Sequence, residues 1–303
     1  MINYNKIIHD LLTIDYNDNS QTGKIMKLLS QLRIPVVRCS AQEGYTITRA
    51  RRGRGYRSAN DMSYKPAILC TEYQRASLPY KTVFYGILSD DEYHLENARA
   101  IGISECSLLS NMGKESIGRE YIANSHWRIV ENIDVVCIVS ANSYKNVNNN
   151  KLLENIKNDF LNCFSENEEA LFVSDYVERE FSKQVTKGHS YEYKVSAMLA
   201  DLLLNTYKFE AVAYPSVKLG GQAGLNLAIR PDIADSKLKL INIADQCYYK
   251  NSENGIVEIE SIYDVVNDKV IKPMHSLTEI EICQKLGIDT IDGECKLNCV
   301  KLQ

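Results

Sequence analysis

The chain has 303 residues, a length that suits one large domain or two smaller ones. Hydrophobic residues make up 45% of it and charged residues 24%, a composition typical of a globular protein and one that excludes collagen-like and disordered chains. The formal net charge of -4 gives no overall attraction to nucleic acid or to an anionic membrane, so any charged partner must be recognised locally.

No run of 18 apolar residues is present, and residues 1–8 lack the basic start and apolar stretch of a secretory signal. We therefore expect a soluble, cytoplasmic protein. The nine cysteines are odd in number and scattered, which favours reduced thiols that pack as small hydrophobic side chains. Cys295 and Cys299 form the only close pair, and because no second pair or neighbouring histidine accompanies them, we predict no metal site.

In the first half of the chain, apolar residues at helical spacing predict two short helices within residues 4–32. Residues 38–57 alternate polar and apolar side chains in part and then become strongly basic. The run 82–87 predicts a strand, and a helix can begin in the polar segment 89–97 that follows. A second strand is predicted at 134–139.

In the second half, residues 144–150 carry four asparagines without an apolar pattern and read as a surface loop. Helical spacing returns at 151–164 and is clearest at 190–205. The remaining segments predict strands at 209–214, 225–229 and 237–244, a glycine-bearing loop at 215–224, and a β-rich tail with a short helix near 278–286. Strands and helices that mix without strict alternation indicate an α+β fold.

The most basic segment of the chain has five arginines in nine positions. They are Arg49, Arg51, Arg52, Arg54 and Arg57. A guanidinium donates paired hydrogen bonds to two phosphate oxygens and stays charged at any relevant pH, so this cluster suits phosphate binding. A solvated charge run and a nucleic-acid-binding arm are the alternatives, although no aromatic platform or known binding module accompanies the arginines.

A second feature links Arg75, Tyr85 and Glu105. The arginine precedes a β-rich run, the tyrosine lies within that run, and the glutamate follows in the next element, so the three can converge on one cleft. The plainer reading makes the tyrosine a core residue and the glutamate a surface residue.

The third feature is Ala-Tyr-Pro-Ser216-Val followed by Gly220, Gly221 and the run Gly224-Leu-Asn226-Leu-Ala, which together hold three glycines. Glycines in such a loop let the backbone approach a ligand closely. The segment lacks Gly-x-Ser-x-Gly, so nothing marks Ser216 as a hydrolase nucleophile, and it misses the spacing of a dinucleotide-binding glycine motif. A plain loop is the alternative.

Taken together and in this order, the motifs resemble the RES domain family. The resemblance covers residues 46–243 and rests on Thr-Arg49-Ala-Arg, Gln-Arg75-Ala-Ser, Val-Phe-Tyr85-Gly, the segment around Glu105, and the segments around Ser216 and Asn226. It implies an ADP-ribosyltransferase-like fold with a central mixed β-sheet flanked by helices. The expected domains are then a RES domain at 38–245 and, outside the resemblance, a helical segment at 1–37 and a β-rich extension at 246–303.

The resemblance implies an enzyme that consumes NAD+ by hydrolysis or phosphorolysis of the nicotinamide–ribose bond. Members of the family are toxins of bacterial toxin–antitoxin pairs. The catalytic residues it implies are Glu105, Arg75, Arg49 and Ser216. The NAD-binding residues it implies are Tyr85, Arg49, Arg51, Arg75, Ser216 and Asn226. Arg51 is the rival of Arg49 for the first arginine of the family. Where the family commonly has asparagine two positions after its second arginine, this chain has Ser77.

The chemistry that these residues would support needs no general acid, because the nicotinamide ring is already a cation in NAD+ and departs as a neutral molecule. Positive charge develops on the ribose, which Glu105 would stabilise, while the arginines would bind the pyrophosphate or an incoming inorganic phosphate. NAD+ is thus the expected substrate, with no metal required, and an antitoxin or inhibitor protein is the expected partner. A monomer and a homo-oligomer both stay open.

Two other functions compete with this one. Transfer of ADP-ribose to a protein or nucleic acid differs only in the acceptor. A non-catalytic module that grips nucleic acid through the arginines of 49–57 would show salt-sensitive binding and no nicotinamide release. The order of Tyr85, Glu105 and Ser216 disfavours the second of these.

Overall fold

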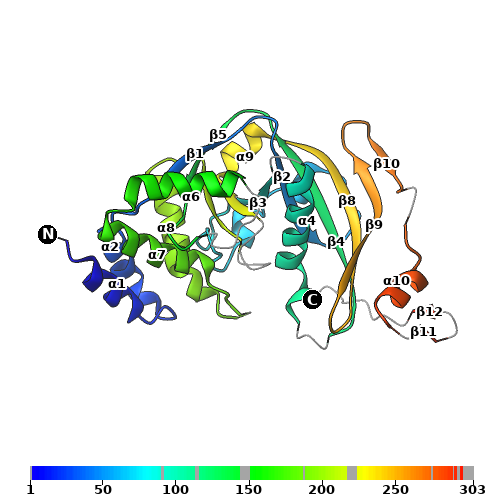
Figure 1. Ribbon diagram of the computed structural model, residues 1–303, viewed down its shortest axis with the longest axis horizontal. Helices are drawn as coiled ribbons and strands as arrows, with labels where there is room; N and C mark the ends of the chain where they lie inside the picture. The colour runs from blue at the N-terminus through cyan, green and yellow to red at the C-terminus, as the bar shows by residue number, and fades with distance from the viewer. Residues whose placement is uncertain are drawn as a thin grey trace. The chain divides into compact units, whose positions relative to one another are not determined.

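The computed structural model describes residues 2–89, 92–112, 116–143, 151–186, 188–216, 224–273, 276–288, 290–291 and 294–295. These form a mixed α+β protein that divides into two compact units (Figure 1). Unit 1 comprises residues 1–43, 64–85 and 131–237, and unit 2 comprises residues 44–63, 86–130 and 238–303. Both units are therefore built from separate stretches of chain. The predicted division into segments 1–37, 38–245 and 246–303 follows the boundaries of the expected RES domain, and it stays a prediction.

Unit 1 has a mixed sheet in the order β1-β5-β6-β7. Its strands are β1 (Val37–Ala41), β5 (Ile133–Cys137), β6 (Ala211–Pro215) and β7 (Leu225–Ile229). Strands β5 and β6 run parallel, whereas the β1–β5 and β6–β7 pairs are antiparallel. All five residues of β6 and of β7 are buried, so these two strands form the centre of the unit.

Helices make up the rest of unit 1. Its α-helices are α1 (Tyr4–Leu12), α2 (Thr22–Leu29), α6 (Lys151–Phe164), α7 (Glu168–Ser182), α8 (Lys194–Asp201) and α9 (Pro231–Lys237). Short turns of helix lie at Asn19–Gln21, Ala67–Leu69, Ser190–Tyr193 and, as a π-helix, Leu202–Thr206. One apolar core joins α1, α2, α7 and α8 to β6, with Leu11, Ile25, Phe181 and Leu199 fully buried in it.

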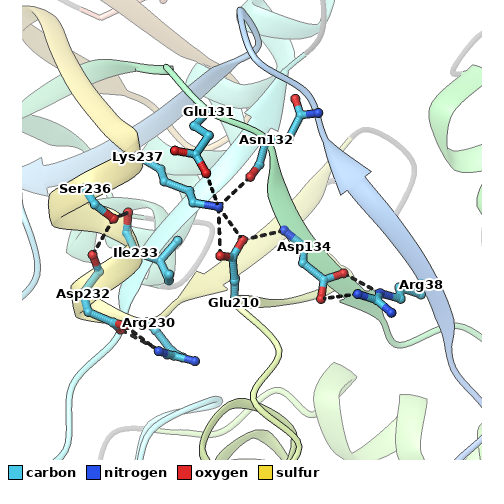
Figure 2. Close-up of polar contacts among 10 residues, drawn as sticks. All are labelled: Arg38, Glu131, Asn132, Asp134, Glu210, Arg230, Asp232, Ile233, Ser236 and Lys237. Carbon is cyan, nitrogen blue, oxygen red and sulfur yellow. Dashed lines mark hydrogen bonds and ion pairs between the residues drawn. The ribbon is translucent and has the colours of Figure 1, made fainter.

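The strand β5 begins beside a network of charged side chains, drawn in Figure 2. The Lys237 ammonium, at the end of α9, lies 2.8 Å from Glu210 Oε1 and 3.1 Å from Glu131 Oε1, and donates to the Asn132 carbonyl at 2.8 Å. Glu210 also accepts the backbone N–H of Asp134 at 2.8 Å. This network ties the start of β5 to the chain that enters β6.

Unit 2 is built on an antiparallel sheet in the order β3-β2-β4-β8-β9-β10. Its strands are β2 (Thr46–Arg52), β3 (Phe84–Ser89), β4 (Gly118–Ile129), β8 (Leu238–Lys250), β9 (Gly255–Asp264) and β10 (Lys269–Ile271), with a separate pair β11 (Thr290–Ile291) and β12 (Glu294–Cys295). Its helices are α3 (Ala59–Met62), α4 (Glu92–Cys106), α5 (Leu108–Asn111) and α10 (Glu279–Lys285).

The two faces of this sheet carry different helices. On one face, α4 packs so closely on β2 that a Cβ at Gly102 would lie 3.1 Å from the Ala50 Cβ. On the other face, Ile282 and Cys283 of α10 join a cluster with Cys247 of β8 and Tyr121 of β4. Because both faces are covered, the long strands of unit 2 lack the simple polar and apolar alternation of a half-exposed sheet.

Most of the predicted elements are confirmed, with shifts at their ends. The helix predicted at 151–164 is α6, and the two predicted within 4–32 are α1 and α2. The segment 190–205 is helical throughout but divides into a 3-10 turn, α8 and a π-helical end. The loop predicted at 144–150 lies outside the described residues, as does Cys299. Within the described part of the chain, no helix is long and apolar enough to cross a membrane.

Six of the cysteines that the structure describes agree with the expected reduced state, and Cys283 does not. Six carry free thiols: Cys39, Cys70, Cys106, Cys137, Cys163 and Cys247. Cys283 is disulfide-bonded, so the expectation of reduced thiols is wrong there. No group of three histidine, cysteine, aspartate or glutamate side chains suited to a metal occurs among the residues described.

Candidate functional site

The predicted site residues divide between the two units. Arg75, Tyr85, Ser216 and Asn226 belong to unit 1, whereas Arg49, Arg51 and Glu105 belong to unit 2. We describe the two groups in turn.

In unit 1, Arg75 lies at the tip of a tight turn. Gln74 N donates to Ser77 O at 2.9 Å and Ser77 N donates back to Gln74 O at 3.3 Å, which closes the turn around Arg75 and Ala76. The Ala76 N–H donates to the Tyr85 phenolic oxygen at 3.0 Å. Tyr85 therefore holds the turn that presents Arg75, a function that its place in the sequence did not reveal.

Ser77 takes part in the same arrangement. Its hydroxyl lies 3.4 Å from the Tyr85 phenol and 3.4 Å from the Gln74 side-chain oxygen, and the residue is 3% exposed. The serine thus supplies local hydrogen bonds at the position where the RES family commonly has asparagine.

The Arg75 guanidinium is held by a backbone oxygen and by aromatic rings. Its Nη1 donates to the carbonyl of Phe181 at the end of α7. Its Cζ lies 5.1 Å from the ring centroid of Tyr193 and 6.0 Å from that of Tyr214. Both rings are within the range over which an aromatic face attracts a cation, so they fix the plane and position of the guanidinium.

Strand geometry brings the third sequence feature to the same place. Tyr214 of β6 is the register partner of Asn226 of β7, so the two side chains lie on one face of the strand pair. Ser216 is two residues beyond Tyr214, and its N–H donates to Gly224 O at 3.1 Å, which continues the pairing. Alternation along the strand therefore places Ser216 on the face where Tyr214 contacts Arg75. Ser216 is fully buried and Asn226 is 4% exposed.

A buried cation, Lys194, directly follows Tyr193 of this group in the sequence. Lys194, the first residue of α8, donates to Asn19 Oδ1 at 3.1 Å and lies 5.4 Å from the ring centroid of Tyr73. Burial lowers the pKa of the Lys194 ammonium. Sequence reasoning missed both Tyr193 and Lys194, although each stands at the start of the most clearly predicted helix.

In unit 2, the arginine cluster is largely paired within the protein. Arg52 Nε lies 2.7 Å from Glu120, Arg54 Nη1 lies 3.1 Å from Glu260, and Arg57 Nη1 lies 3.2 Å from Asp245. Arg51 donates to the Asp61 carbonyl, and Arg54 stacks on Tyr121 with its Cζ 3.8 Å from the ring centroid. Most of the cluster therefore fixes β2 and the following loop to neighbouring strands. Because carboxylates already pair with three of these guanidinium groups, the arrangement counts against a nucleic-acid-binding arm.

Within unit 2, Glu105 lies on α4, which packs on one face of the sheet, whereas the side chain of Arg49 on β2 belongs to the other face. Ala50 faces Gly102 of α4, so alternation along β2 turns Arg49 and Arg51 to the other face. Glu105 is an exposed residue in the last turn of α4. The backbone thus gives Arg49 no direct approach to α4, and a joint action of Arg49 and Glu105 stays a prediction.

No model of a known protein family matches the chain, and no curated protein matches it either. The likeness to the RES family therefore rests on the motifs of the sequence alone. Of those motifs, the geometry joins Tyr85 to the turn of Arg75, and it brings Arg75 to Tyr214, whose strand pair also carries Ser216 and Asn226.

Proposed function

We propose that this protein cleaves the bond between nicotinamide and ribose in NAD+. The observation that carries the proposal is the convergence in unit 1 of Arg75, its supporting residue Tyr85, and the strand positions of Ser216 and Asn226. These four residues come from two separate stretches of chain, 64–85 and 131–237, and a purely structural turn would not require all of them. Family membership in the RES group and an ADP-ribosyltransferase-like fold are part of the same proposal.

Arg75 is proposed to bind the pyrophosphate or an attacking phosphate. Its two contacts with Phe181 O and the Tyr193 hydroxyl occupy part of a group that carries five N–H donors. A guanidinium held in one plane donates paired hydrogen bonds to two oxygens of a phosphate, and its prior fixation lowers the entropy lost on binding. Asn226 and Ser216 would hydrogen-bond to ribose or the carboxamide.

The bond cleavage itself is proposed to depend on Glu105. When the C1′–N bond breaks, its electron pair moves to the nicotinamide nitrogen and the ring leaves neutral. Positive charge develops on the ribose, as in glycoside cleavage, and a carboxylate nearby stabilises it. Either an anionic oxygen of phosphate bonds to C1′, or the oxygen of a water molecule does so and loses a proton to solvent. Glu105 is the acidic residue that the motif comparison assigns to this task.

The decisive experiment measures nicotinamide released from NAD+ by the purified full chain, with and without inorganic phosphate. Mass spectrometry of the products distinguishes ADP-ribose, its phosphate ester, and ADP-ribose attached to a macromolecule. Free ADP-ribose or its phosphate ester would support the proposal. If nicotinamide is not released under any of these conditions, or if all ADP-ribose is found on a macromolecule, the proposal is wrong.

Variants of two glutamates on one helix test the assigned acid. We expect Glu105→Gln to lower kcat by about 10²- to 10³-fold with little change in KM, because a carboxylate acts most strongly on the charge of the transition state. Glu96→Gln is the matched control, since Glu96 lies on the same helix with its side chain 76% exposed. Equal activities of the two variants would remove Glu105 from the mechanism.

The biological setting is proposed to be that of a toxin or defence effector in the cytoplasm, restrained by an antitoxin protein. Its test is the NAD+ content of cells that express the chain. We expect a fall in NAD+ with the native sequence and none with Glu105→Gln. If cellular NAD+ is unchanged although the purified protein cleaves NAD+, the proposed role as a toxin or defence effector is wrong.

A further inference from the structure

Two cysteines from distant parts of the sequence meet in the sheet of unit 1. Cys39 lies on β1 and Cys137 on β5, 98 residues later, and their Sγ atoms are 3.0 Å apart. A covalent disulfide has an S–S length of about 2.05 Å, so closing this gap needs a movement of about 1 Å. Both residues carry free thiols.

The backbone around the two thiols fixes them in this position. In the antiparallel β1–β5 pair, Cys39 is the partner of Val135 and Cys137 is the partner of Val37, so the cysteines are diagonal neighbours on one face. Next to them, Arg38 Nε and Nη2 bind the two carboxylate oxygens of Asp134 at 2.7 and 3.0 Å (Figure 2). This paired contact crosses the same two strands and opposes any slip in their register.

The two cysteines differ in burial. Cys39 is partly exposed as a residue, whereas Cys137 is 1% exposed. The hydrogen bond between the two groups lowers the pKa of the Cys39 thiol and raises that of Cys137. The less buried cysteine is therefore also the one that forms a thiolate more readily, and a thiolate is the form that reacts with oxidants.

We propose that Cys39 and Cys137 form a reversible redox site that a peroxide converts to a disulfide. The Cys39 thiolate attacks one oxygen of the peroxide, the O–O bond breaks, and a sulfenic acid forms while hydroxide leaves and takes up a proton. The Cys137 thiol then attacks the Cys39 sulfur, an S–S bond forms, and the sulfenic hydroxyl leaves as water. For hydrogen peroxide, the two thiols lose two electrons and two protons in all, and the peroxide is reduced to two molecules of water.

The place of this site in the chain gives the bond a mechanical consequence. The chain leaves unit 1 after Glu43, returns for residues 64–85 and returns again at Glu131, so β1 and β5 are the strands on either side of both excursions. A bond between Cys39 and Cys137 closes the whole intervening stretch into a covalent loop. Loops of such length lose much of their freedom in the unfolded state, which favours the folded protein after oxidation.

The other described cysteines provide the comparison. Cys163, on α6, is exposed, whereas Cys39 is partly exposed and has the Cys137 sulfur 3.0 Å away. If exposure alone determines which cysteine reacts, hydrogen peroxide oxidises Cys163 first. If the neighbouring thiol determines the product, hydrogen peroxide gives the cross-link between Cys39 and Cys137.

The test treats the purified full chain with hydrogen peroxide, blocks remaining thiols with an alkylating reagent, and identifies the digested peptides by mass spectrometry. We expect a cross-linked peptide that joins Cys39 to Cys137, is two hydrogens lighter than the two free peptides together, and disappears on treatment with dithiothreitol. The cross-link should persist in Cys163→Ser and be lost in Cys39→Ser. On a non-reducing denaturing gel, the oxidised chain should migrate faster.

The same measurements can overturn the proposal. If Cys39 is recovered as a sulfinic acid, or as an alkylated thiol after peroxide treatment has oxidised Cys163, then the two sulfurs do not act as a pair. The comparison of oxidised with reduced wild-type protein needs no substitution, so a failure of Cys39→Ser to fold leaves the test intact. None of these readouts depends on NAD+ cleavage.

Discussion

The carboxylate of Glu120 on β4 offers the strongest test of how unit 2 is held together. Its side chain is 3% exposed and accepts four hydrogen bonds: from Arg52 Nε at 2.7 Å, from Ser107 Oγ at 2.6 Å, and from the backbone N–H groups of Leu108 and Leu109 at 3.3 and 3.1 Å. One buried acid thus joins β2, β4 and the start of α5. Glu120→Ala would leave a guanidinium, a hydroxyl and two N–H groups without this acceptor.

The expected cost follows from these contacts. Removing one partner of a buried ion pair costs about 3 to 5 kcal/mol, because the other charge stays buried without compensation. The Arg52 side chain is 21% exposed, so water can hydrate it in part, and we place the loss at the lower end, about 3 kcal/mol. The exposed pair between Arg54 and Glu260 is the control, since its side chains are 53% and 34% exposed. Glu260→Ala should cost about 0 to 1 kcal/mol.

Urea unfolding provides the assay, and the chain contains its own probe. Trp127 is the single tryptophan, it lies on β4 with Glu120, and it is 4% exposed. Its fluorescence therefore reports the unfolding of unit 2. With a slope of about 2 kcal/mol per molar urea, a loss of about 3 kcal/mol lowers the midpoint by about 1.5 M.

The result has a clear refutation. If Glu120→Ala moves the midpoint no further than Glu260→Ala, the buried acid is not the connection that we describe. A double variant that replaces Arg52 by Met and Glu120 by Leu should recover part of the loss, because a packed apolar pair leaves no buried charge.

Two further predictions concern the packing of α4 on the sheet. Gly102→Val should lower the free energy of unfolding by about 1 to 3 kcal/mol, since a Cβ there already lies 3.1 Å from the Ala50 Cβ. Urea unfolding followed by tryptophan fluorescence measures this loss, and a neutral effect would contradict the close approach of α4. His126 accepts from Arg99 at 3.2 Å, and burial, aided by the Arg99 charge, lowers its pKa to about 4. Because the unfolded histidine gains its proton near pH 6.5 and the folded one near 4, stability should fall by about 2 kcal/mol from pH 7 to pH 5, and His126→Gln should remove that part of the pH dependence.

The helices show what periodicity can and cannot reveal. The helix predicted at 151–164 has the bounds of α6, because its apolar residues Leu153, Ile156 and Phe160 recur on one side against a polar remainder. Helix α7 was missed, although its buried Val173, Val177 and Phe181 follow the same spacing. The signal was present, together with an Asn167 cap and two acidic residues in the first turn, and a search for caps would have found it.

The strand β4 was missed for a different reason. Its sequence contains Asn124, Ser125 and His126 in a row, and all three are buried. Their partners come from elsewhere in the chain: the Asn124 amide donates to Gln246 Oε1 at 2.7 Å, 122 residues away. A polar run reads as a loop when only local sequence is considered, and the hydrogen bonds that make it a buried strand arise from the tertiary fold.

The predicted site residues also show how little local sequence reveals about tertiary contacts. The arginines at 49–57 attract attention because they are adjacent in sequence, yet Arg52, Arg54 and Arg57 pair with acids 68, 206 and 188 residues away. Local density of charge therefore carries little information about whether a charge is available to a ligand. Arg75, which lies outside the cluster, is held instead by a carbonyl and two aromatic rings. An arginine that a fold fixes without neutralising it keeps its charge for a phosphate, and for this reason we assign the anion to Arg75 before any member of the cluster.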